Sequence, residues 1–428
     1  MKLTVSKSGP LNGTVRPPSN KSITHRAYIF AGLAEDGPSI VRSPLMAEDC
    51  EATLKIMQSL GCTVERGEET VKITPPAEFV QPRHDLDCGN SGTTMRLIAG
   101  VLAAAEGIDA TLIGDASLSR RPMQRIIEPL LRMGAQIEGD TAPLKIIGKQ
   151  LKAISYESPV ASAQIKSCIL FAGLKCDGVT WVREPCKSRD HTERFLQGLG
   201  VEVLQDGDLK VGVRGGSKGG AFDVTVSADI SSAAFFLCAG AMIQGSDVTL
   251  TEVGVNPTRT GVIDVLKSAG AKIENKNDSL QMGEPVTDLR ILCYNQLEAL
   301  EVSGDLVPRL IDEIPVLAVL ATQCHGTTKF RDAKGMRVKE SERIEVVAEG
   351  LRRMGADVMT YEDGLSVNGP VRLKGAEIDA AGDHRIGMAF AIAGLVAEGE
   401  TTILNADSIR TSYPEFEQHL RVLSASQV

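Results

Sequence analysis

The chain has 428 residues, 43% of them hydrophobic and 24% charged, which is enough for two globular domains with cores of their own. Its formal net charge of −9 argues against a nucleic-acid-binding protein. The nine cysteines show no C-x-x-C spacing, so they predict neither a zinc site nor a disulfide framework but small buried side chains in a reducing compartment. We see neither a secretory signal nor an apolar run of about 18 residues, so we expect a cytoplasmic protein that does not span a membrane.

Residues 3–16 alternate between apolar and polar side chains, which predicts a strand. Six similar segments then follow, each with polar residues, an apolar helix rich in small residues, a glycine-bearing turn and a β-rich run. The polar starts of these helices are Lys21-Ser22, Ser91-Gly92, Ser162-Ala163-Gln164, Asp229-Ile230-Ser231-Ser232, Asp312-Glu313 and Asp383-His384-Arg385. A repeat of this kind indicates similar structural units. Because the helices are apolar on all sides, we expect them to be buried.

A second phrase recurs between these helices, namely an amphipathic helix that ends in glycine and is followed by a strand. The glycines of its five copies are Gly61, Gly134, Gly200, Gly270 and Gly355. Glycine just past a helix adopts the left-handed cap conformation without a Cβ clash, and amphipathic helices lie at the surface. The six units divide into three and three, and we expect the break near residues 215–228, which begin with a glycine-rich loop.

The first buried helix carries Lys21, Ser22 and Arg26 in its first turns. A helix N-terminus offers free N–H groups and a positive dipole end, so lysine and serine there favour a bound phosphate or carboxylate. Taken alone, a plain serine cap with basic neighbours is the simpler interpretation. Because hydroxyl, amide and cationic residues recur at later helix starts of an acidic chain, we favour a small anionic ligand that is held locally.

Three further loops contain candidate polar residues. Gly89 and Gly92 flank a helix start, where glycine lets a ligand approach the backbone, although a glycine-rich turn alone is weak support. Two arginines, ending at Arg121, precede Pro122, which predicts the start of a helix; the alternative is a solvated loop. His191 has no second histidine at metal spacing, so we expect it to form a hydrogen bond at a helix start.

In the second half of the chain, Asp312 and Glu313 lie at the mouth of a buried helix. These carboxylates either complement the helix dipole, or one of them lies in a partly dry site and is available as a base. Lys339 and Arg343 are four residues apart, which predicts that they share one face of a helix. If the polar helix starts of both halves face one cleft between the domains, they form a cationic slot that closes on a multiply anionic substrate.

Taken together, these motifs closely resemble the 5-enolpyruvylshikimate-3-phosphate synthase family along nearly the whole chain. The matching motifs are Lys21-Ser22 with Arg26, Gly89-Asn90-Ser91-Gly92-Thr93, Arg121-Pro122-Met123, Ser162-Ala163-Gln164, Leu310-Ile311-Asp312-Glu313, Val338-Lys339-Glu340-Ser341-Glu342-Arg343 and Gly382-Asp383-His384-Arg385-Ile386. The resemblance implies an α/β (α+β) enolpyruvyl-transferase fold with six βαβαββ-type repeats, three per domain, and buried helices within sheets. The first lobe would comprise residues 21–227 and the second residues 1–20 and 228–428.

The resemblance also implies the activity. The family transfers the enolpyruvyl group of phosphoenolpyruvate to the 5-hydroxyl of shikimate 3-phosphate and releases phosphate, a step toward chorismate and the aromatic amino acids. It needs no cofactor and no metal, and we expect a monomer that binds these two small anions.

Residue roles carry over by position. The residues expected to hold phosphoenolpyruvate are Lys21, Gly92, Arg121, Gln164, Arg343 and Arg385. Those expected to hold shikimate 3-phosphate are Lys21, Ser22, Arg26, Ser162, Gln164, Ser188, Asp312 and Lys339. Asp312 is assigned as the base for the hydroxyl. Glu340 is the expected acid and base at the methylene carbon, with Lys21 as the alternative.

Some positions depart from the family pattern, among them Ala163, where many members have a second serine. The Ser-Ala-Gln-x-Lys, Arg-x-His-x-Glu and Asn-x-Thr-Arg phrases resemble the subgroup that is less sensitive to glyphosate, whereas Gly92 retains room for that inhibitor, so sensitivity stays open. Two other functions are alternatives. A sister transferase that acts on UDP-N-acetylglucosamine has a cysteine in the mobile loop, and residues 114–123 contain none. A non-catalytic anion-binding protein would not need Asp312 and Glu340.

Overall fold

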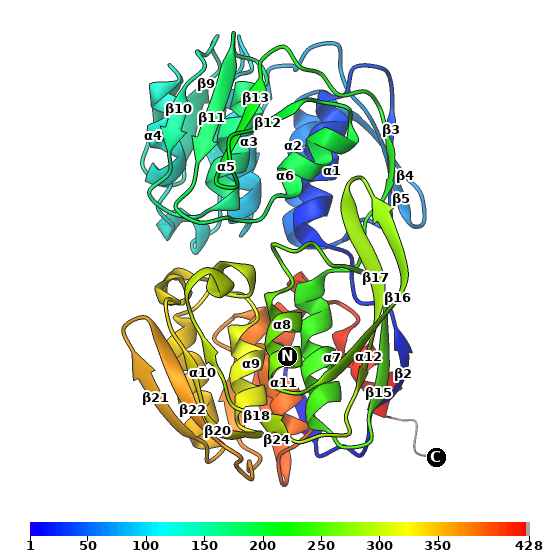
Figure 1. Cartoon of the computed structure of the whole chain (residues 1–428). Helices are drawn as coiled ribbons and strands as arrows, with labels where there is room; N and C mark the ends of the chain where they lie inside the picture. The colour runs from blue at the N-terminus through cyan, green and yellow to red at the C-terminus, as the bar shows by residue number, and fades with distance from the viewer. Residues whose placement is uncertain (425–428) are drawn as a thin grey trace. The chain divides into compact units, whose positions relative to one another are not determined.

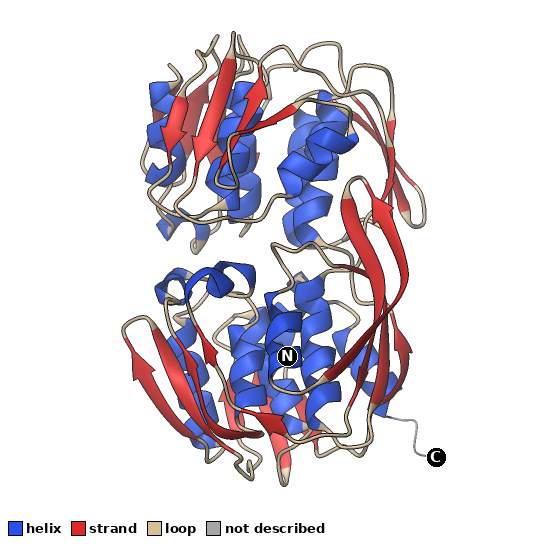
Figure 2. Cartoon of the chain, viewed as in Figure 1, coloured by secondary structure: helices blue, strands red, loops and turns tan. Residues whose placement is uncertain are grey.

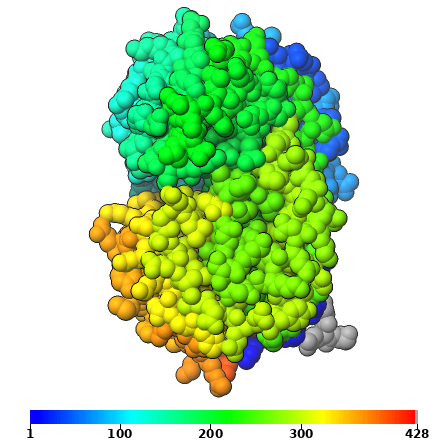
Figure 3. Space-filling view, viewed as in Figure 1, coloured from blue at the N-terminus to red at the C-terminus, as the bar shows by residue number. Residues whose placement is uncertain are grey.

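The computed structural model describes residues 1–424, which form two units of helices and small sheets (Figures 1 and 2). Unit 1 comprises Met1–Pro18, Ser227–Ser279 and Pro285–Val428. Unit 2 comprises Ser19–Val226 and the short segment Leu280–Glu284. On the surface, unit 2 can be followed from blue through cyan to green and unit 1 mainly from green through yellow to red (Figure 3).

Unit 2 contains three buried helices, α1 (Lys21–Leu33), α3 (Gly92–Ala103) and α5 (Ala163–Gly173). Each is followed along the chain by a second helix, namely α2 (Glu48–Ser59), α4 (Gln124–Arg132) and α6 (His191–Gly198). A short 3-10 helix, η1, covers Leu118–Arg120.

The three sheets of unit 2 share one topology. Their strand orders are β14-β3-β5-β4, β6-β7-β9-β8 and β10-β11-β13-β12. The strands are β3 (Ser39–Arg42), β4 (Thr63–Arg66), β5 (Thr70–Thr74), β6 (Leu86–Asp87), β7 (Asp109–Ile113), β8 (Gln136–Glu138), β9 (Leu144–Ile147), β10 (Ser155–Glu157), β11 (Val179–Arg183), β12 (Val203–Gln205), β13 (Lys210–Arg214) and β14 (Asp223–Thr225). In each sheet the first pair is parallel and the other two pairs are antiparallel.

Unit 1 repeats the pairing of a buried and an outer helix. The buried helices are α7 (Ile230–Met242), α9 (Ile314–Ala321) and α11 (His384–Gly394), and the outer ones are α8 (Gly261–Ser268), α10 (Arg343–Arg353) and α12 (Phe416–Ser424). Three 3-10 helices are η2 (Gly304–Arg309), η3 (Lys334–Val338) and η4 (Ala406–Thr411).

The sheets of unit 1 have the orders β16-β17-β15-β2, β18-β20-β22-β21 with β19 beside β20, and β1-β24-β23. The strands are β1 (Leu3–Ser6), β2 (Asn12–Val15), β15 (Asp247–Gly254), β16 (Lys272–Gln281), β17 (Glu284–Leu292), β18 (Leu297–Glu298), β19 (Glu301–Val302), β20 (Cys324–Phe330), β21 (Asp357–Tyr361), β22 (Gly364–Gly369), β23 (Glu377–Asp379) and β24 (Glu400–Leu404). The predicted strand over residues 3–16 is therefore two strands, which join two different sheets. A mixed α/β fold of repeated units is confirmed.

The predicted buried helices are confirmed. In α7 every residue from Ile230 to Ala241 is buried, and all of α9 is buried. Their sequences have no polar face to turn toward water, so both helices lie in the hydrophobic core of unit 1. Ser91, one of the predicted polar starts, acts as a cap, since its Oγ accepts the Thr94 N–H at 3.1 Å. Helix α1 is capped by Asn20, whose Oδ1 accepts the Ile23 N–H at 3.0 Å, instead of by Ser22.

The glycines after the amphipathic helices adopt the expected conformation. All five have positive φ, between 75° and 104°: Gly61, Gly134, Gly200, Gly270 and Gly355. One helix start was predicted wrongly. Helix α4 begins at Gln124 instead of Pro122, because the Met123 N–H bonds to the Asp140 carbonyl at 3.1 Å before the chain turns into the helix.

The cysteines are small buried side chains, as predicted. All nine cysteines are free thiols, and all but the half-buried Cys186 are buried. None of the helices in residues 1–424 is long and apolar enough to cross a membrane.

Candidate active site

Predicted site residues gather at the N-terminal ends of the buried helices within each unit. The unit 2 cluster, around the starts of α1, α3 and α5, consists of Lys21, Ser22, Arg26, Gly92, Arg121, Ser162, Gln164 and Ser188. The unit 1 cluster, around the starts of α9 and α11, consists of Asp312, Lys339, Glu340, Arg343 and Arg385. Three aligned helix dipoles place positive potential at such ends, which favours anions there.

In unit 2, hydrogen bonds join the helix starts. Lys21 Nζ donates to Asp49 Oδ2 at 3.0 Å. Gln164 donates its side-chain N–H to Thr93 Oγ1 at 2.9 Å and accepts from Arg96 at 2.7 Å. The first turns of α3 and α5 are therefore fixed relative to each other.

Arg26 is buried and held from three sides. Its Nε donates to Thr192 Oγ1 at 2.7 Å and its Nη2 to Ser167 Oγ at 2.8 Å, while Nη1 donates to the Ser22 carbonyl at 2.8 Å. These contacts connect α1 with α5 and α6. They fix one positive charge in the interior of unit 2, beside the start of α1.

Gly92 opens α3 beneath two guanidinium groups. A Cβ atom there would lie 2.9 Å from Arg96 Nη1 and 3.4 Å from Arg121 Nη1. Arg121 in turn donates to Asn90 Oδ1 at 2.8 Å. The missing side chain thus leaves space at a helix N-terminus that two cations border, as an anion site requires.

A buried carboxylate links the two predicted serines of this cluster. Glu184 Oε1 accepts the Ser162 N–H at 3.0 Å, and its Oε2 accepts the Ser188 N–H at 3.4 Å and Lys166 Nζ at 2.8 Å. Lys166 also pairs with Glu193 at 2.8 Å. Burial alone would lower the pKa of Lys166, but the two carboxylates outweigh it and raise that pKa, so the lysine stays charged.

Two histidines near this cluster have structural partners. Burial lowers the pKa of His25 to about 3, and its Nδ1 is hydrogen-bonded to Thr53 Oγ1 at 2.7 Å, so it is neutral at physiological pH. His191 opens α6, as predicted, and its Nδ1 is hydrogen-bonded to Glu284 Oε1 at 2.8 Å.

In unit 1, Arg343 is the centre of the cluster and is 1% exposed. Its guanidinium contacts three carboxylates: Asp383 at 2.7 Å, Glu340 at 2.6 Å and Asp312 at 3.3 Å. Burial alone would lower the pKa of Arg343, but these carboxylates raise it, so the side chain is always charged. Burial alone would raise the pKa of Asp383, but Arg343 and the neighbouring His384 outweigh it and lower that pKa.

Lys339 also reaches Asp312, with Nζ 3.2 Å from Oδ1. The prediction that Lys339 and Arg343 share a helical face is wrong, because Lys339 has an extended conformation and α10 begins only at Arg343. Glu342 caps that helix by accepting the Glu345 N–H at 2.7 Å. The two cations meet at one carboxylate through tertiary contacts instead.

Glu313 and its neighbours connect the helix starts around which this cluster lies. The Glu313 side chain is fully buried at the start of α9 and accepts a hydrogen bond from Ser231 Oγ at the start of α7. Its Oε1 lies 3.6 Å from Arg385 Nη1 and 3.9 Å from Arg259 Nη2. Arg385 also donates to the Asp312 carbonyl at 3.3 Å. The starts of all three buried helices of unit 1 are thereby joined.

Sequence reasoning did not identify Asp49, Arg96 and Glu184 as partners of the site residues. Asp49 lies in the acidic first turn of α2, which is an ordinary dipole-complementing pattern. Glu184 directly follows Arg183, the last residue of β11. Neither position differs in sequence from many surface carboxylates, so only the tertiary contacts identify them.

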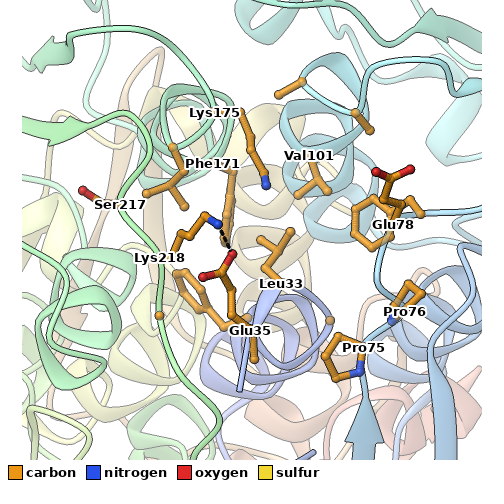
Figure 4. Close-up of a pocket in the computed structure, with 18 of the residues that line it drawn as sticks. Leu33, Glu35, Pro75, Pro76, Glu78, Val101, Phe171, Lys175, Ser217 and Lys218 are labelled. Carbon is orange, nitrogen blue, oxygen red and sulfur yellow. Dashed lines mark ion pairs between the residues drawn. The ribbon is translucent and has the colours of Figure 1, made fainter. Parts of the chain in front are cut away.

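A pocket of about 880 Å³ lies at the other ends of α1, α3 and α5 (Figure 4). Leu33, Val101 and Phe171 form part of its apolar lining, and Lys218 pairs with Glu35 at its edge. None of the predicted site residues lines it. It is therefore distinct from the unit 2 cluster.

The fold defines the class of protein. A solved enolpyruvyl transferase from Streptomyces tendae has a TM-score of 0.80 over 99% of this chain and 97% of that one, at 18% sequence identity. The chain therefore has an enolpyruvyl-transferase fold.

Closer similarities identify the family. The family model of EPSP synthase (3-phosphoshikimate 1-carboxyvinyltransferase) matches residues 5–420, so the chain belongs to that family. An EPSP synthase from Acinetobacter baumannii has a TM-score of 0.90 at 40% identity over 99% of this chain and 98% of that one. Proteins named 3-phosphoshikimate 1-carboxyvinyltransferase are 46% identical in Brevibacillus brevis (99% of this chain, 100% of that one) and 46% identical in Bacillus subtilis (97% of each).

Proposed function

We propose that the chain is a 3-phosphoshikimate 1-carboxyvinyltransferase (EC 2.5.1.19), which transfers the enolpyruvyl group of phosphoenolpyruvate to the 5-hydroxyl of shikimate 3-phosphate. The observation that carries the proposal is the family match over residues 5–420, which includes the helix starts of both clusters. Full-length relatives that bear the name of this enzyme support it further, and they favour it over a transferase for UDP-N-acetylglucosamine.

Phosphoenolpyruvate carries a phosphate and a carboxylate, which together require several cations. We assign Arg121, Arg343 and Arg385 to it because a guanidinium fork matches both groups. Gly92 would let it approach the start of α3. Lys21 and Gln164 complete the proposed set.

Shikimate 3-phosphate is assigned to residues that border the starts of α1 and α5 and to two residues of unit 1. The proposed contacts are Lys21, Ser22, Arg26, Ser162, Gln164, Ser188, Asp312 and Lys339. Among residues 1–424 the buried Ser188 hydroxyl has no hydrogen-bond partner. An unsatisfied buried hydroxyl is costly, which supports a ligand contact at this position.

The proposed reaction is an addition followed by an elimination. The 5-hydroxyl oxygen attacks C2 of phosphoenolpyruvate, its proton passes to a base, and C3 gains a proton to become a methyl group. The resulting ketal then loses phosphate from C2 and a proton from the methyl group, which restores the enol ether.

Asp312 is the proposed base for the hydroxyl proton. Its carboxylate lies beside Lys339 and Arg343, and both contacts fix its orientation. Glu340 is proposed to exchange the proton at C3, with Lys21 as the alternative. Glu340 is held by Arg343 at 2.6 Å.

Coupled phosphate release tests the function. We expect phosphate only when both phosphoenolpyruvate and shikimate 3-phosphate are present, and an unchanged rate with EDTA, since no metal is proposed. Release with UDP-N-acetylglucosamine as acceptor would support the sister activity. Binding of phosphoenolpyruvate without any release would indicate a non-catalytic protein. The proposed monomeric state and cytoplasmic location are testable by light scattering and cell fractionation.

A further inference from the structure

Glu184 is buried, and its carboxylate oxygens are directed at protein groups. Direct contact with a substrate therefore does not explain its position. The carboxylate accepts the backbone N–H of Ser162 and that of Ser188, which are 26 positions apart in the chain. Ser162 caps α5, and Ser188 lies in the loop before α6. One side chain therefore sets the backbone positions of both serines that the proposed function assigns to shikimate 3-phosphate.

The charge of Glu184 is compensated locally. Lys166 Nζ lies 2.8 Å from Glu184 Oε2 and 2.8 Å from Glu193 Oε1, and the three side chains are 3%, 4% and 8% exposed. An uncompensated carboxylate beside a phosphate site would repel the phosphate. Because Lys166 compensates the negative charge, the Glu184 carboxylate can serve there as a pair of hydrogen-bond acceptors.

Apolar side chains of similar volume would hold α5 and α6 together at least as well as a buried ion pair. The hydrogen bonds to two serine N–H groups are what apolar packing cannot supply. The Ser188 hydroxyl adds a second observation, since it is buried and has no partner among the described residues. Its backbone is held in place while the hydroxyl is left for another molecule.

We infer that Glu184, neutralised by Lys166, is a positioning residue that presents Ser162 and Ser188 to the phosphate group of the acceptor. The inference rests on the proposed function, in which that acceptor is shikimate 3-phosphate. Glu184 acts through the two backbone segments and does not touch the substrate.

The variant Glu184→Gln tests this role because it keeps the shape but loses the charge and one acceptor. Its Kd for shikimate 3-phosphate should rise about tenfold, and its Kd for shikimate, which lacks the phosphate, should change less than about twofold. Calorimetry measures both constants. In steady-state assays the KM for shikimate 3-phosphate should rise, while the KM for phosphoenolpyruvate and kcat change by less than about threefold.

Glu157→Gln is the matched control, because Glu157 pairs with Arg183 on the adjacent strands at 3.5 Å and is largely exposed. It should leave both binding constants unchanged. If Glu184→Gln does not fold, Glu184→Asp keeps the charge opposite Lys166 but shortens the reach to the serines. It should show the same selective loss.

A double-variant cycle separates positioning from general support. In a Ser162→Ala/Ser188→Ala background, Glu184→Gln should change the Kd for shikimate 3-phosphate by less than about twofold, because the groups it positions are gone. Equal weakening of shikimate and shikimate 3-phosphate, or full additivity, would overturn the inference. If the unaltered enzyme binds neither acceptor and releases no phosphate, the proposed function itself fails.

Discussion

At the residue scale, Asp312 combines partial burial with two cationic partners. Its Oδ1 is shared by Lys339 at 3.2 Å and Arg343 at 3.3 Å, and its backbone carbonyl accepts from Arg385. A carboxylate fixed in this way keeps its orientation when a substrate arrives. Its proposed use as a base therefore predicts an effect on turnover more than on binding.

Asp312→Asn should lower kcat about 10²-fold or more, because the amide cannot accept the hydroxyl proton. The KM values for both substrates should change less than about threefold, since the amide keeps the shape of the side chain. Steady-state phosphate release measures both parameters. The exposed Asp305→Asn in η2 is the control and should behave like the unaltered enzyme. Near-normal turnover in Asp312→Asn would remove this residue from the mechanism.

Gly92→Ala tests the space at the start of α3. The added methyl group would lie 2.9 Å from Arg96 Nη1 and 3.4 Å from Arg121 Nη1, so both guanidinium groups must move. We expect the KM for phosphoenolpyruvate to rise about tenfold, because a displaced cation no longer matches the bound anion.

The control for this substitution is Gly220→Ala, where a Cβ would approach only the exposed Asp36 side chain at 3.2 Å. It should leave the KM for phosphoenolpyruvate unchanged. An unchanged KM in Gly92→Ala would show that phosphoenolpyruvate does not use this space.

Sequence patterns predicted which residues lie at the helix starts, but not the partners that hold them. Lys21 and Arg385 were recognisable because charge at the start of an apolar helix is unusual. Glu184 was not, since a carboxylate after a strand is common and its burial depends on how α5 and α6 pack. The resemblance to a known family supplied the residue roles, which composition and spacing left open.

At the element scale, helix type and order were predictable because an apolar helix and an amphipathic helix have different sequence periods. Local backbone geometry was less predictable. The four-residue spacing of Lys339 and Arg343 suggested one helix, whereas the Glu342 cap starts α10 between them. Spacing rules assume a continuous helix, and they fail where a cap interrupts it.

Asp383 caps α11 and also pairs with the buried Arg343, which predicts that the stability of the protein depends on pH. Asp383 accepts the Arg385 N–H at 3.0 Å as a cap and pairs with the buried Arg343 at 2.7 Å. Burial alone would raise its pKa, but the charge and hydrogen bond of Arg343 together with His384 outweigh burial and lower that pKa below the ordinary value of 3.8. The stabilisation is therefore complete above that value and is lost as the pH falls through the lower native pKa.

Asp383→Asn keeps a capping oxygen but removes the charge. We expect a loss of about 2 kcal/mol in the free energy of unfolding at pH 7, because the buried Arg343 loses one of its three carboxylate partners. The difference from the unaltered protein should shrink as the pH falls below 3.8. Urea unfolding between pH 7 and pH 3 measures it. The exposed Asp357→Asn is the control, and a pH-independent difference would contradict the assignment.

At the scale of the whole molecule, strands from distant parts of the chain complete the repeats. Strand β14 pairs with β3 in unit 2, while β1 and β2 join β24 and β15 in unit 1. The repeat pattern in the sequence predicted six similar units but not which strands complete each sheet. The predicted lobe ranges, residues 21–227 and residues 1–20 with 228–428, stay a prediction.

Each unit has a hydrophobic core of its own, which predicts that the units can be destabilised separately. The single tryptophan, Trp181, lies on β11 of unit 2, so its fluorescence reports unfolding of that unit. Gly355 follows α10 in unit 1 with φ of +90°, where a Cβ meets no atom within 4 Å. Alanine there costs about 1–2 kcal/mol from backbone strain alone.

We expect Gly355→Ala to shift part of the urea transition seen by circular dichroism to lower concentration, while the Trp181 fluorescence midpoint stays unchanged. Gly134→Ala is the matched control, because Gly134 follows α4 in unit 2 with φ of +98° and equally open surroundings. It should shift the fluorescence midpoint. Equal shifts of both signals in both variants would mean that the chain unfolds as one cooperative body. Strain placed in either unit would then lower the stability of both units.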